Sequence, residues 1–407
     1  MKVLQVNCVY NKGSTGKIIY DLHKGLLSNG EESIVCYGRG EVVKEDNVYK
    51  ICKELYSKFN NLLSRITGLM YAGCFFSTNK LIRIIKKEKP DVVHLHCLNG
   101  YFVNIYRLVT WLKNSGIKTI LTLHAEFMHT ANCGHAFECE KWKNGCGKCP
   151  RLRKETKSWF FDNTHKSWLK MKKAFDGFDD LTIVSVSPWL MERAKQSPIL
   201  KDKKHCVVLN GLDTSIFKLY DTQQLRKKHN LIGKKIIFHA TPFFNDDPEN
   251  IKGGYYVIKL AEKLLSNDNI RIVVAGNYPK TLKVPSNIIF LGRVNNQQAL
   301  AEYYSMADVT VLTSKRETFS MVVAESLCCG TPVAGFRAGG PEQIAIMEYC
   351  KFVGFGDVGG ISKAMTELID IPISKDEIAK IAAKKYSSKR MVNHTLELYE
   401  KDLCVYG

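Results

Sequence analysis

The chain has 407 residues, of which 45% are hydrophobic and 24% are charged, the composition of an ordinary globular protein. This composition excludes a disordered chain and a collagen-like repeat, and no window approaches the ~20 consecutive apolar residues of a membrane span. The 59 basic residues outnumber the 40 acidic ones, and the net charge of +19 favours an anionic partner: nucleic acid, an acidic membrane or a phosphorylated small molecule.

The N-terminal half alternates apolar, β-branched runs with segments of helical spacing. The first run, Val3–Val9, is too interrupted for a signal peptide, so we expect a buried strand and a cytoplasmic protein. A helix over Lys17–Leu27 follows it, and a second helix is predicted over Tyr101–Asn114. Further strands are predicted at Val92–His96, Ile120–Leu123, Leu181–Val186 and Val207–Leu209. Runs that are apolar on both faces and separated by helices predict a parallel sheet covered on both sides.

The C-terminal half repeats the pattern. Strands are predicted at Ile236–Ala240, Ile270–Ala275, Ile288–Leu291, Val309–Thr313 and Pro332–Gly335, and helices at Tyr255–Leu265, Ala299–Met306, Met321–Cys329 and Gly360–Leu368. We therefore predict an α/β protein with two Rossmann-like domains, residues 1–205 and 206–385, and a C-terminal helix in 386–407 that could return to the first domain. Two such domains facing each other would form a cleft beyond the carboxyl ends of their strands.

One stretch, from Ala125 to about Thr164, lacks any clear period and is predicted to be a functional insertion. It holds Cys133, Cys139, Cys146 and Cys149. The last two have the two-residue gap of a zinc knuckle, and the first two could complete a tetrahedral thiolate site. In a reducing cytosol metal is preferred over disulfides, and free thiols in a packed loop are the alternative. Other cysteines are interpreted as small buried hydrophobes: Cys8, Cys36, Cys97, Cys206, Cys328 and Cys329.

Positive charge and aromatic side chains are concentrated in residues 141–173. This stretch contains eleven basic and two acidic residues, interleaved with Trp142, Trp159, Phe160, Phe161 and Trp168. Such a pattern suits the interface of an anionic membrane or nucleic acid, and a solvated basic helix is the alternative.

Two glycine-rich turns are candidate phosphate sites. Gly13-Ser14-Thr15-Gly16 separates the first strand from the first helix, where backbone amides and the helix dipole favour an anion. Lys252-Gly253-Gly254 opens a helix in the second half and adds a point charge. A plain tight turn and a solvent-facing lysine are the respective alternatives.

The most specific cluster lies between Thr313 and Pro332. Glu317 follows a predicted strand, and Glu325 lies eight residues later on the next helix. A carboxylate can accept two hydrogen bonds from the diol of a sugar or ribose, and the loop amides of Phe319 and Ser320 can add more.

With Gly339-Gly340-Pro341-Glu342 and Leu291-Gly292-Arg293-Val294, these segments resemble the family-4 retaining glycosyltransferases, which have the GT-B fold. The resemblance implies that Glu317 contacts the transferred sugar and that Glu325 holds the nucleotide ribose. It also implies that Lys252 and the turn at Gly16 bind the diphosphate and that Gly292 and Arg293 flank the base. His124 resembles the family histidine that lines the reaction centre, and a core histidine is the alternative.

The sequence departs from the family pattern at one point. The family commonly has an arginine a few residues before the lysine, and none precedes Lys252 here. Arg293, Arg316 or Lys17 would supply the second charge, or one cation would suffice.

The resemblance predicts a hexosyltransferase that uses a UDP- or GDP-linked sugar without a catalytic metal or organic cofactor. Its relatives build bacterial capsule, exopolysaccharide and O-antigen, so we expect a saccharide linked to a lipid diphosphate as acceptor. The enzyme would then work in the cytoplasm, peripherally at an anionic inner membrane face, with no nucleic acid as partner. A sugar-nucleotide epimerase of similar fold and a nucleic-acid-binding zinc protein are the alternatives.

Overall fold

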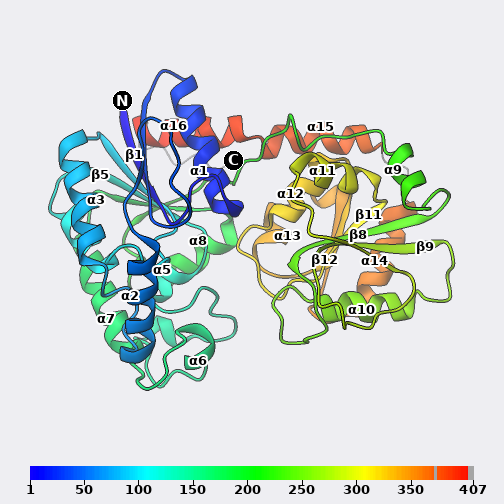
Figure 1. Ribbon diagram of the computed structural model, residues 1–407, viewed down its shortest axis with the longest axis horizontal. Helices are drawn as coiled ribbons and strands as arrows, with labels where there is room; N and C mark the ends of the chain where they lie inside the picture. The colour runs from blue at the N-terminus through cyan, green and yellow to red at the C-terminus, as the bar shows by residue number, and fades with distance from the viewer. Residues whose placement is uncertain (371–373, 402–407) are drawn as a thin grey trace. The chain divides into compact units, whose positions relative to one another are not determined.

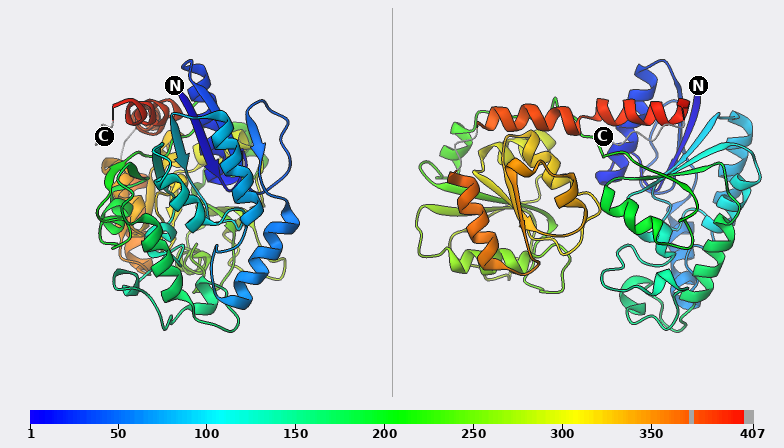
Figure 2. Two further views of the ribbon diagram at one scale, coloured as in Figure 1. Left: turned by 90° about the vertical axis from the view of Figure 1, so that its left-hand side faces the viewer. Right: turned by 180° about the vertical axis from the view of Figure 1, so that it is seen from behind.

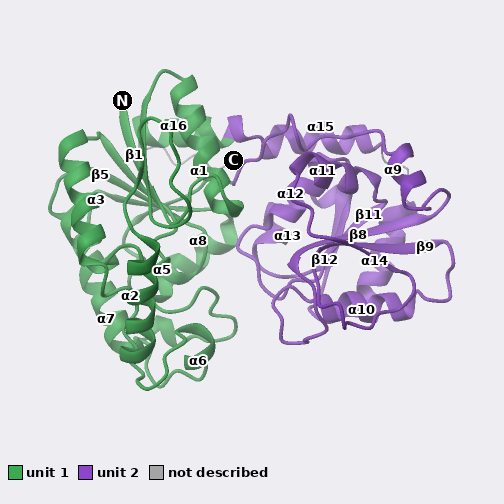
Figure 3. Cartoon of the chain, in the orientation of Figure 1, with its two compact units in different colours: residues 1–209, 391–407 green, residues 210–390 purple. Residues whose placement is uncertain are grey.

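Two parallel sheets, each covered by helices, organise residues 1–370 and 374–401, the part of the chain that the computed structural model describes (Figure 1). The chain divides into two compact units (Figure 3). Unit 1 contains residues 1–209 and the residues from 391 onward, and unit 2 contains residues 210–390. Among the described residues, no helix is both long and apolar enough to cross a bilayer.

Unit 1 is built on a seven-stranded sheet with the order β3-β2-β1-β4-β5-β6-β7, in which every neighbouring pair is parallel. The strands are β1 (Lys2–Asn7), β2 (Glu32–Tyr37), β3 (Val48–Lys50), β4 (Val92–Leu95), β5 (Lys118–Leu123), β6 (Leu181–Ser185) and β7 (Lys204–Val207). The order reverses between β1 and β4, so the segments that follow these two strands border a topological switch point.

The helices of unit 1 are α1 (Gly13–Ser28), α2 (Glu54–Thr67), α3 (Phe75–Glu88), α4 (Ile105–Lys113), α5 (Phe127–Thr130), α6 (Leu152–Glu155), α7 (Thr164–Phe175) and α8 (Pro188–Lys195). The insertion from Ala125 to about Thr164 contains only α5, α6 and the 3-10 turn η1 (Lys141–Lys143), as its lack of period predicts.

The last described helix, α16 (Ser388–Lys401), packs on unit 1. Met391, Val392 and Leu398 share a core cluster with Ile18, Leu22 and Leu26 of α1 and with strands β1, β4 and β5. Figure 2 shows α1 and α16 side by side. Their crossing needs a glycine, because a Cβ at Gly25 would collide with Val392. Residues 402–407 of the predicted C-terminal helix lie outside the described residues.

Unit 2 is built on a six-stranded parallel sheet with the order β10-β9-β8-β11-β12-β13. Its strands are β8 (Lys235–Phe243), β9 (Ile270–Asn277), β10 (Ile288–Gly292), β11 (Val309–Leu312), β12 (Val333–Phe336) and β13 (Cys350–Val353). Its helices are α9 (Gln223–Lys228), α10 (Gly254–Lys263), α11 (Gln297–Met306), α12 (Met321–Cys328), α13 (Gly340–Ile344), α14 (Val358–Asp370) and α15 (Lys375–Tyr386), with the 3-10 turn η2 (Met347–Tyr349). Here the order reverses between β8 and β11, the expected place for a ligand.

Several predicted elements differ in their bounds. The helix predicted over Tyr101–Asn114 begins only at Ile105, because the Asn104 side chain caps it by accepting a hydrogen bond from the Arg107 backbone N–H. The strand predicted at Val207–Leu209 instead ends at Val207. Cys8 and Cys97 are only half-buried, whereas the other four cysteines predicted to be hydrophobes are buried.

Candidate functional site

Two loops of unit 2 meet at the switch point of its sheet. Lys252 follows β8 and Glu317 follows β11, and the Lys252 ammonium lies 2.6 Å from the Glu317 carboxylate. The Thr313 hydroxyl donates to the Lys252 carbonyl at 3.1 Å, which ties the loops together. Gly253 has a φ of +70°, and a Cβ there would collide with the Thr313 carbonyl. The glycine after Lys252 is therefore required by this close approach of the two loops.

The backbone of Glu317 is fixed by the segment after β12. Its N–H donates to the Ala338 carbonyl at 3.0 Å, and its carbonyl accepts from the Gly340 N–H at 2.9 Å. A Cβ at Gly340 would collide with the Thr318 backbone. Glu342 caps α13 by accepting from the backbone N–H groups of Ala338 and Gly339. The Gly339–Glu342 segment thus holds the backbone of Glu317 in position.

Phe319, Ser320 and Glu325 continue the same strand-loop-helix unit. Ser320 has a φ of +79° directly before α12, and its buried hydroxyl has no hydrogen-bond partner among the described residues. Phe319 is buried beside it. On α12, the Glu325 carboxylate accepts a hydrogen bond from the Tyr304 hydroxyl at 3.0 Å. Burial, together with this carboxylate, raises the pKa of Tyr304 well above its ordinary value, so the phenol remains a donor.

Gly292 and Arg293 lie apart from this cluster in the sheet order. Gly292 ends the edge strand β10, which β9 separates from β8, and Arg293 is exposed just after it. Both lie at the carboxyl edge of the sheet, as do Lys252 and Glu317. The structure therefore brings Lys252, Glu317 and the Gly339–Gly340 turn into contact and leaves Arg293 at the rim of that edge.

In unit 1, His124 belongs to a row of three histidines at the carboxyl ends of β4 and β5. Its Nε2 lies 3.3 Å from Nδ1 of His96, and the ring of His96 lies 3.9 Å from that of His94. His94 is hydrogen-bonded to the Thr122 hydroxyl at 2.7 Å and to the Tyr399 hydroxyl of α16 at 2.6 Å. Sequence reasoning missed His94 and His96, although the pattern His-Leu-His at a strand end was visible.

Burial decides the charge of this row. It lowers the pKa of His94 to about 3 and that of His124 to about 4, and it holds the pKa of His96 well below its ordinary value. The three imidazoles are therefore neutral at physiological pH. His124 is half-buried, so it can offer an uncharged hydrogen-bonding group at the end of its strand.

The segment Gly13–Gly16, predicted to separate the first strand from a helix beginning at Lys17, instead forms the first turn of α1, which begins at Gly13. The Gly16 carbonyl accepts from the Asn11 N–H at 2.9 Å, and a Cβ at Gly16 would press against Val9. The side chain of Lys12, the N-cap residue of α1, makes no capping hydrogen bond. The turn is therefore held by close packing, and a helix N-terminus of this kind favours anions.

The four cysteines of the insertion are free and half-buried. The Cys133 thiol interacts electrostatically with the other three, so the four lie in one region. Burial raises the pKa of Cys133 above its ordinary range and that of Cys146 to about 11. Among the described residues, no group of three or more His, Cys, Asp or Glu side chains could hold a metal ion. Zinc binding by these four cysteines stays a prediction, as does the alternative of free thiols in a packed loop.

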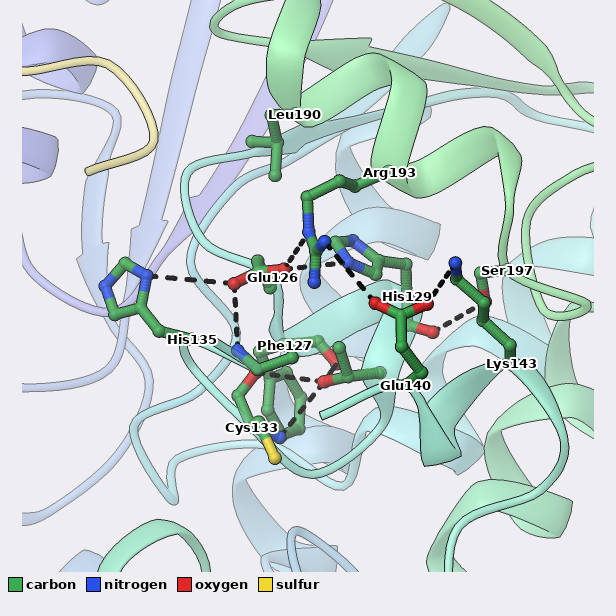
Figure 4. Close-up of polar contacts among 12 residues, drawn as sticks. Glu126, Phe127, His129, Cys133, His135, Glu140, Lys143, Leu190, Arg193 and Ser197 are labelled. Carbon is green, nitrogen blue, oxygen red and sulfur yellow. Dashed lines mark hydrogen bonds and ion pairs between the residues drawn. The ribbon is translucent and has the colours of Figure 1, made fainter. Parts of the chain in front are cut away.

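A buried carboxylate fastens the start of the insertion (Figure 4). Glu126, two residues after His124, is fully buried and lies 2.5 Å from Nε of Arg193 on α8. It also accepts from the Ala136 N–H at 2.8 Å, and Nε2 of His129 lies 3.6 Å from it. Burial alone would raise the pKa of Glu126, but His129 and Arg193 hold it at about 2. The cluster, which sequence reasoning missed, anchors the insertion to the Rossmann-like core beside His124.

Comparison with known families matches both halves of the chain. Residues 15–216 match the family described as Glycosyltransferase Family 4, and residues 221–385 match the family described as Glycosyl transferases group 1. Together the two matches cover most of the sequence.

Individual proteins are similar over nearly the whole length. The putative colanic acid biosynthesis glycosyl transferase WcaC of Escherichia coli K12 is 22% identical, covering 98% of this chain and 100% of the relative. The N-acetyl-alpha-D-glucosaminyl L-malate synthase of Bacillus anthracis is 27% identical, over 89% of this chain and 86% of the relative. The structure of HepE from Anabaena, in complex with UDP, has a TM-score of 0.63 at 14% identity, covering 98% of this chain and 99% of that one. This likeness identifies the fold as GT-B, as predicted.

Proposed function

Since the chain belongs to the glycosyltransferases, with a family-4 region followed by a group 1 region, we propose that it is a retaining hexosyltransferase of surface-polysaccharide synthesis. The observation that carries the proposal is the contact between Lys252 and Glu317 at the switch point of the unit 2 sheet. A cation and a carboxylate held together there suit a ligand with both phosphate and hydroxyl groups, as a nucleotide sugar has. The name of the WcaC relative supports the polysaccharide context.

The donor would bind along the carboxyl edge of unit 2. Lys252 attracts the diphosphate, and Glu317 accepts hydrogen bonds from hydroxyl groups of the hexose. The buried hydroxyl of Ser320, which lacks a partner among the described residues, is available to the same ligand. Glu325, oriented by Tyr304, accepts from the ribose diol. The nucleotide would be UDP or GDP, and the UDP bound by HepE, a protein of the same fold, favours UDP.

The proposed reaction requires no nucleophile from the enzyme. As the sugar-phosphate bond breaks, positive charge at Lys252 and at helix N-termini stabilises the departing diphosphate. A leaving-group oxygen takes the proton of the acceptor hydroxyl on the same face, which retains the anomeric configuration. His124, neutral at physiological pH, would hydrogen-bond at the reaction centre without adding charge.

The acceptor would be a saccharide linked to a lipid diphosphate. Residues 1–200 contain 31 basic and 18 acidic side chains, so most of the excess positive charge lies in unit 1. Such a surface attracts an anionic acceptor and an anionic membrane. The protein would therefore act peripherally at the inner face of the cell membrane.

A donor and acceptor screen tests the proposal. Purified protein is incubated with UDP- and GDP-linked hexoses and a lipid-diphosphate saccharide, and the products are analysed by mass spectrometry. We expect one donor to give a saccharide lengthened by one hexose, with retained configuration by NMR. Free epimerised sugar nucleotide without transfer would favour the epimerase alternative. Transfer to malate, as the name of the Bacillus relative suggests for that protein, would replace the lipid-linked acceptor with a water-soluble one.

A further inference from the structure

Helix α2 of unit 1 presents its apolar face to solvent and its polar face to the protein. The buried side chains of the helix are Ser57, Asn60 and Ser64. The large apolar side chains are exposed, with Leu55 at 80% and Phe59 at 55%, followed by Leu62, Leu63 and Ile66. Positions 55, 59, 62 and 66 recur at helical spacing, so they form one continuous stripe. This is the reverse of the usual arrangement in a water-exposed helix.

Hydrogen bonds, rather than apolar packing, hold α2 in place. The Ser57 hydroxyl donates to the Gly100 carbonyl at 3.1 Å, and the Asn60 side chain accepts from the Cys74 N–H at 2.8 Å. The hydroxyls of Ser64 and Tyr101 lie 3.3 Å apart. The exposed stripe therefore makes little contribution to the packing of this helix.

Two neighbouring segments extend the stripe. Phe76 at the start of α3 is 79% exposed, and its ring lies 5.8 Å from that of Tyr56 on α2. The loop between α6 and α7 carries Trp159, Phe160 and Phe161, all exposed. This loop runs against the end of α2, because the Trp159 N–H donates to the Arg65 carbonyl at 2.8 Å. We call the outward face of α2, Phe75–Phe76 and Trp159–Phe161 together the α2 surface.

Positive charge adjoins the α2 surface. A hollow of about 790 Å³ between α3, α4 and α7 shares Phe75 with it. The hollow is lined by Arg83, Lys86, Arg107 and Lys170, and no described acidic residue lines it. The single acidic residue of α2, Glu54, is paired with Arg39 at 2.9 Å. The surroundings therefore complement an anionic partner.

We propose that the α2 surface docks onto an anionic lipid bilayer. In this arrangement α2 lies in the plane of the interface with its apolar stripe below the headgroups, and Trp159–Phe161 lie at headgroup level. The cations of the hollow face lipid phosphates. A second copy of the chain fits less well, because pairing through this surface would bring two positively charged hollows together. The inference rests on the proposed function for its purpose, which is to bring unit 1 to a lipid-linked acceptor.

Vesicle binding tests the inference directly. The full chain is sedimented with vesicles of phosphatidylcholine alone or with equal parts of phosphatidylglycerol. The test variant replaces two exposed residues of α2 (Phe59→Ser with Ile66→Ser). The matched control replaces two exposed apolar residues of unit 2 (Ile232→Ser with Leu265→Ser). Neither pair lies in the packed core, so both variants are expected to fold, which thermal melting checks.

We expect the wild type and the control to bind the anionic vesicles and the α2 variant to bind about tenfold less tightly or worse, because two large apolar side chains no longer enter the lipid. Equal binding by both double variants would overturn the inference. If the wild type does not bind vesicles but forms a dimer, and the α2 variant is a monomer, the inference is overturned and the surface is assigned to self-association. Donor hydrolysis, measured without lipid, distinguishes failure of the proposed function from failure of this inference. If neither the wild type nor the variants hydrolyse a donor, the proposed function fails. Normal hydrolysis without vesicle binding removes only this inference.

Discussion

Glu126 in unit 1 and Glu317 in unit 2 each meet a cation at nearly the same distance, 2.5 Å to Arg193 and 2.6 Å to Lys252. Their surroundings differ. Glu126 is fully buried and also bonded to a backbone N–H, whereas Glu317 is 17% and Lys252 36% exposed. The first carboxylate has its hydrogen-bonding capacity taken up by the protein, and the second retains capacity for a ligand. Burial and the number of partners, more than the ion pair itself, distinguish a carboxylate that serves only the fold from one that can still accept hydrogen bonds from a ligand.

The largest expected effect is on folding. Glu126→Gln keeps the shape of the side chain but leaves the Arg193 cation without its buried counter-charge, so the free energy of unfolding should fall by about 3–5 kcal/mol. Chemical denaturation followed by circular dichroism measures it. The matched change Glu317→Gln, in a partly exposed pair, should alter stability by only ~0–1 kcal/mol. Equal losses in the two variants would contradict the comparison.

Turnover should show the opposite order. Glu317→Gln is expected to lower kcat by about 10²–10³-fold, the usual result of removing a polar group aimed at the transition state. Initial rates with the identified donor and acceptor check this, with Glu348→Gln, an exposed carboxylate of unit 2, as control. Unchanged kcat would remove Glu317 from the reaction centre and leave it as a partner that orients Lys252.

Lowering the pH should destabilise the fold of unit 1 through protonation of Glu126. Its pKa is about 2 in the folded protein, below the ~4.3 of a free glutamate, so its charged form stabilises the fold. That contribution, ~3 kcal/mol at most, is fully present above the unfolded pKa and is lost as the pH falls from about 4 to 2. Unfolding free energies across this window should therefore decline more steeply in the wild type than in Glu126→Gln. Parallel curves would show that Glu126 is not the group that titrates.

The smallest expected effect is on nucleotide affinity. Glu325→Ala should weaken nucleoside-diphosphate binding by about 1–3 kcal/mol, because the ribose hydroxyls lose their acceptor. Tyr304→Phe removes the hydroxyl that orients Glu325 and should weaken binding by roughly 1 kcal/mol. Isothermal titration calorimetry measures both. An undiminished affinity in Glu325→Ala would contradict the ribose assignment.

The candidate residues of unit 2 were easier to pick out in the sequence because most of them lie within one short segment. Thr313–Pro332 contains both glutamates within one strand-loop-helix unit, whereas Lys252 with its glycines follows β8, 65 residues before Glu317. Parallel strands bring such loops to one edge of the sheet, and the pairing of β8 with β11 places these two near one another. The contact of Gly340 with Thr318 could not be foreseen, since it depends on how closely two loops approach.

Unit 1 was harder to predict because its contacts join distant residues. His94 meets Tyr399 across 305 positions, and no sequence motif links Glu126 to Arg193. A helical period is readable in the sequence at Leu55, Phe59, Leu62 and Ile66. The period alone does not tell which face of the helix points outward. Ser57 and Asn60 decide this through Gly100 and Cys74 in other segments. Spacing along the chain likewise does not determine how the four thiols of the insertion converge, so their zinc site stays a prediction.

The return of α16 to unit 1 has a consequence for synthesis on the ribosome. The core cluster that contains Val3, Ile18 and Leu22 is completed by Met391, Val392 and Leu398, which are translated after the whole of unit 2. All of unit 2 has then already been made and can fold first, while the nascent unit 1 still exposes the apolar side of α1. A chain that terminates before Met391 should therefore leave unit 1 incompletely folded and prone to aggregation, even though every strand of both sheets has been made.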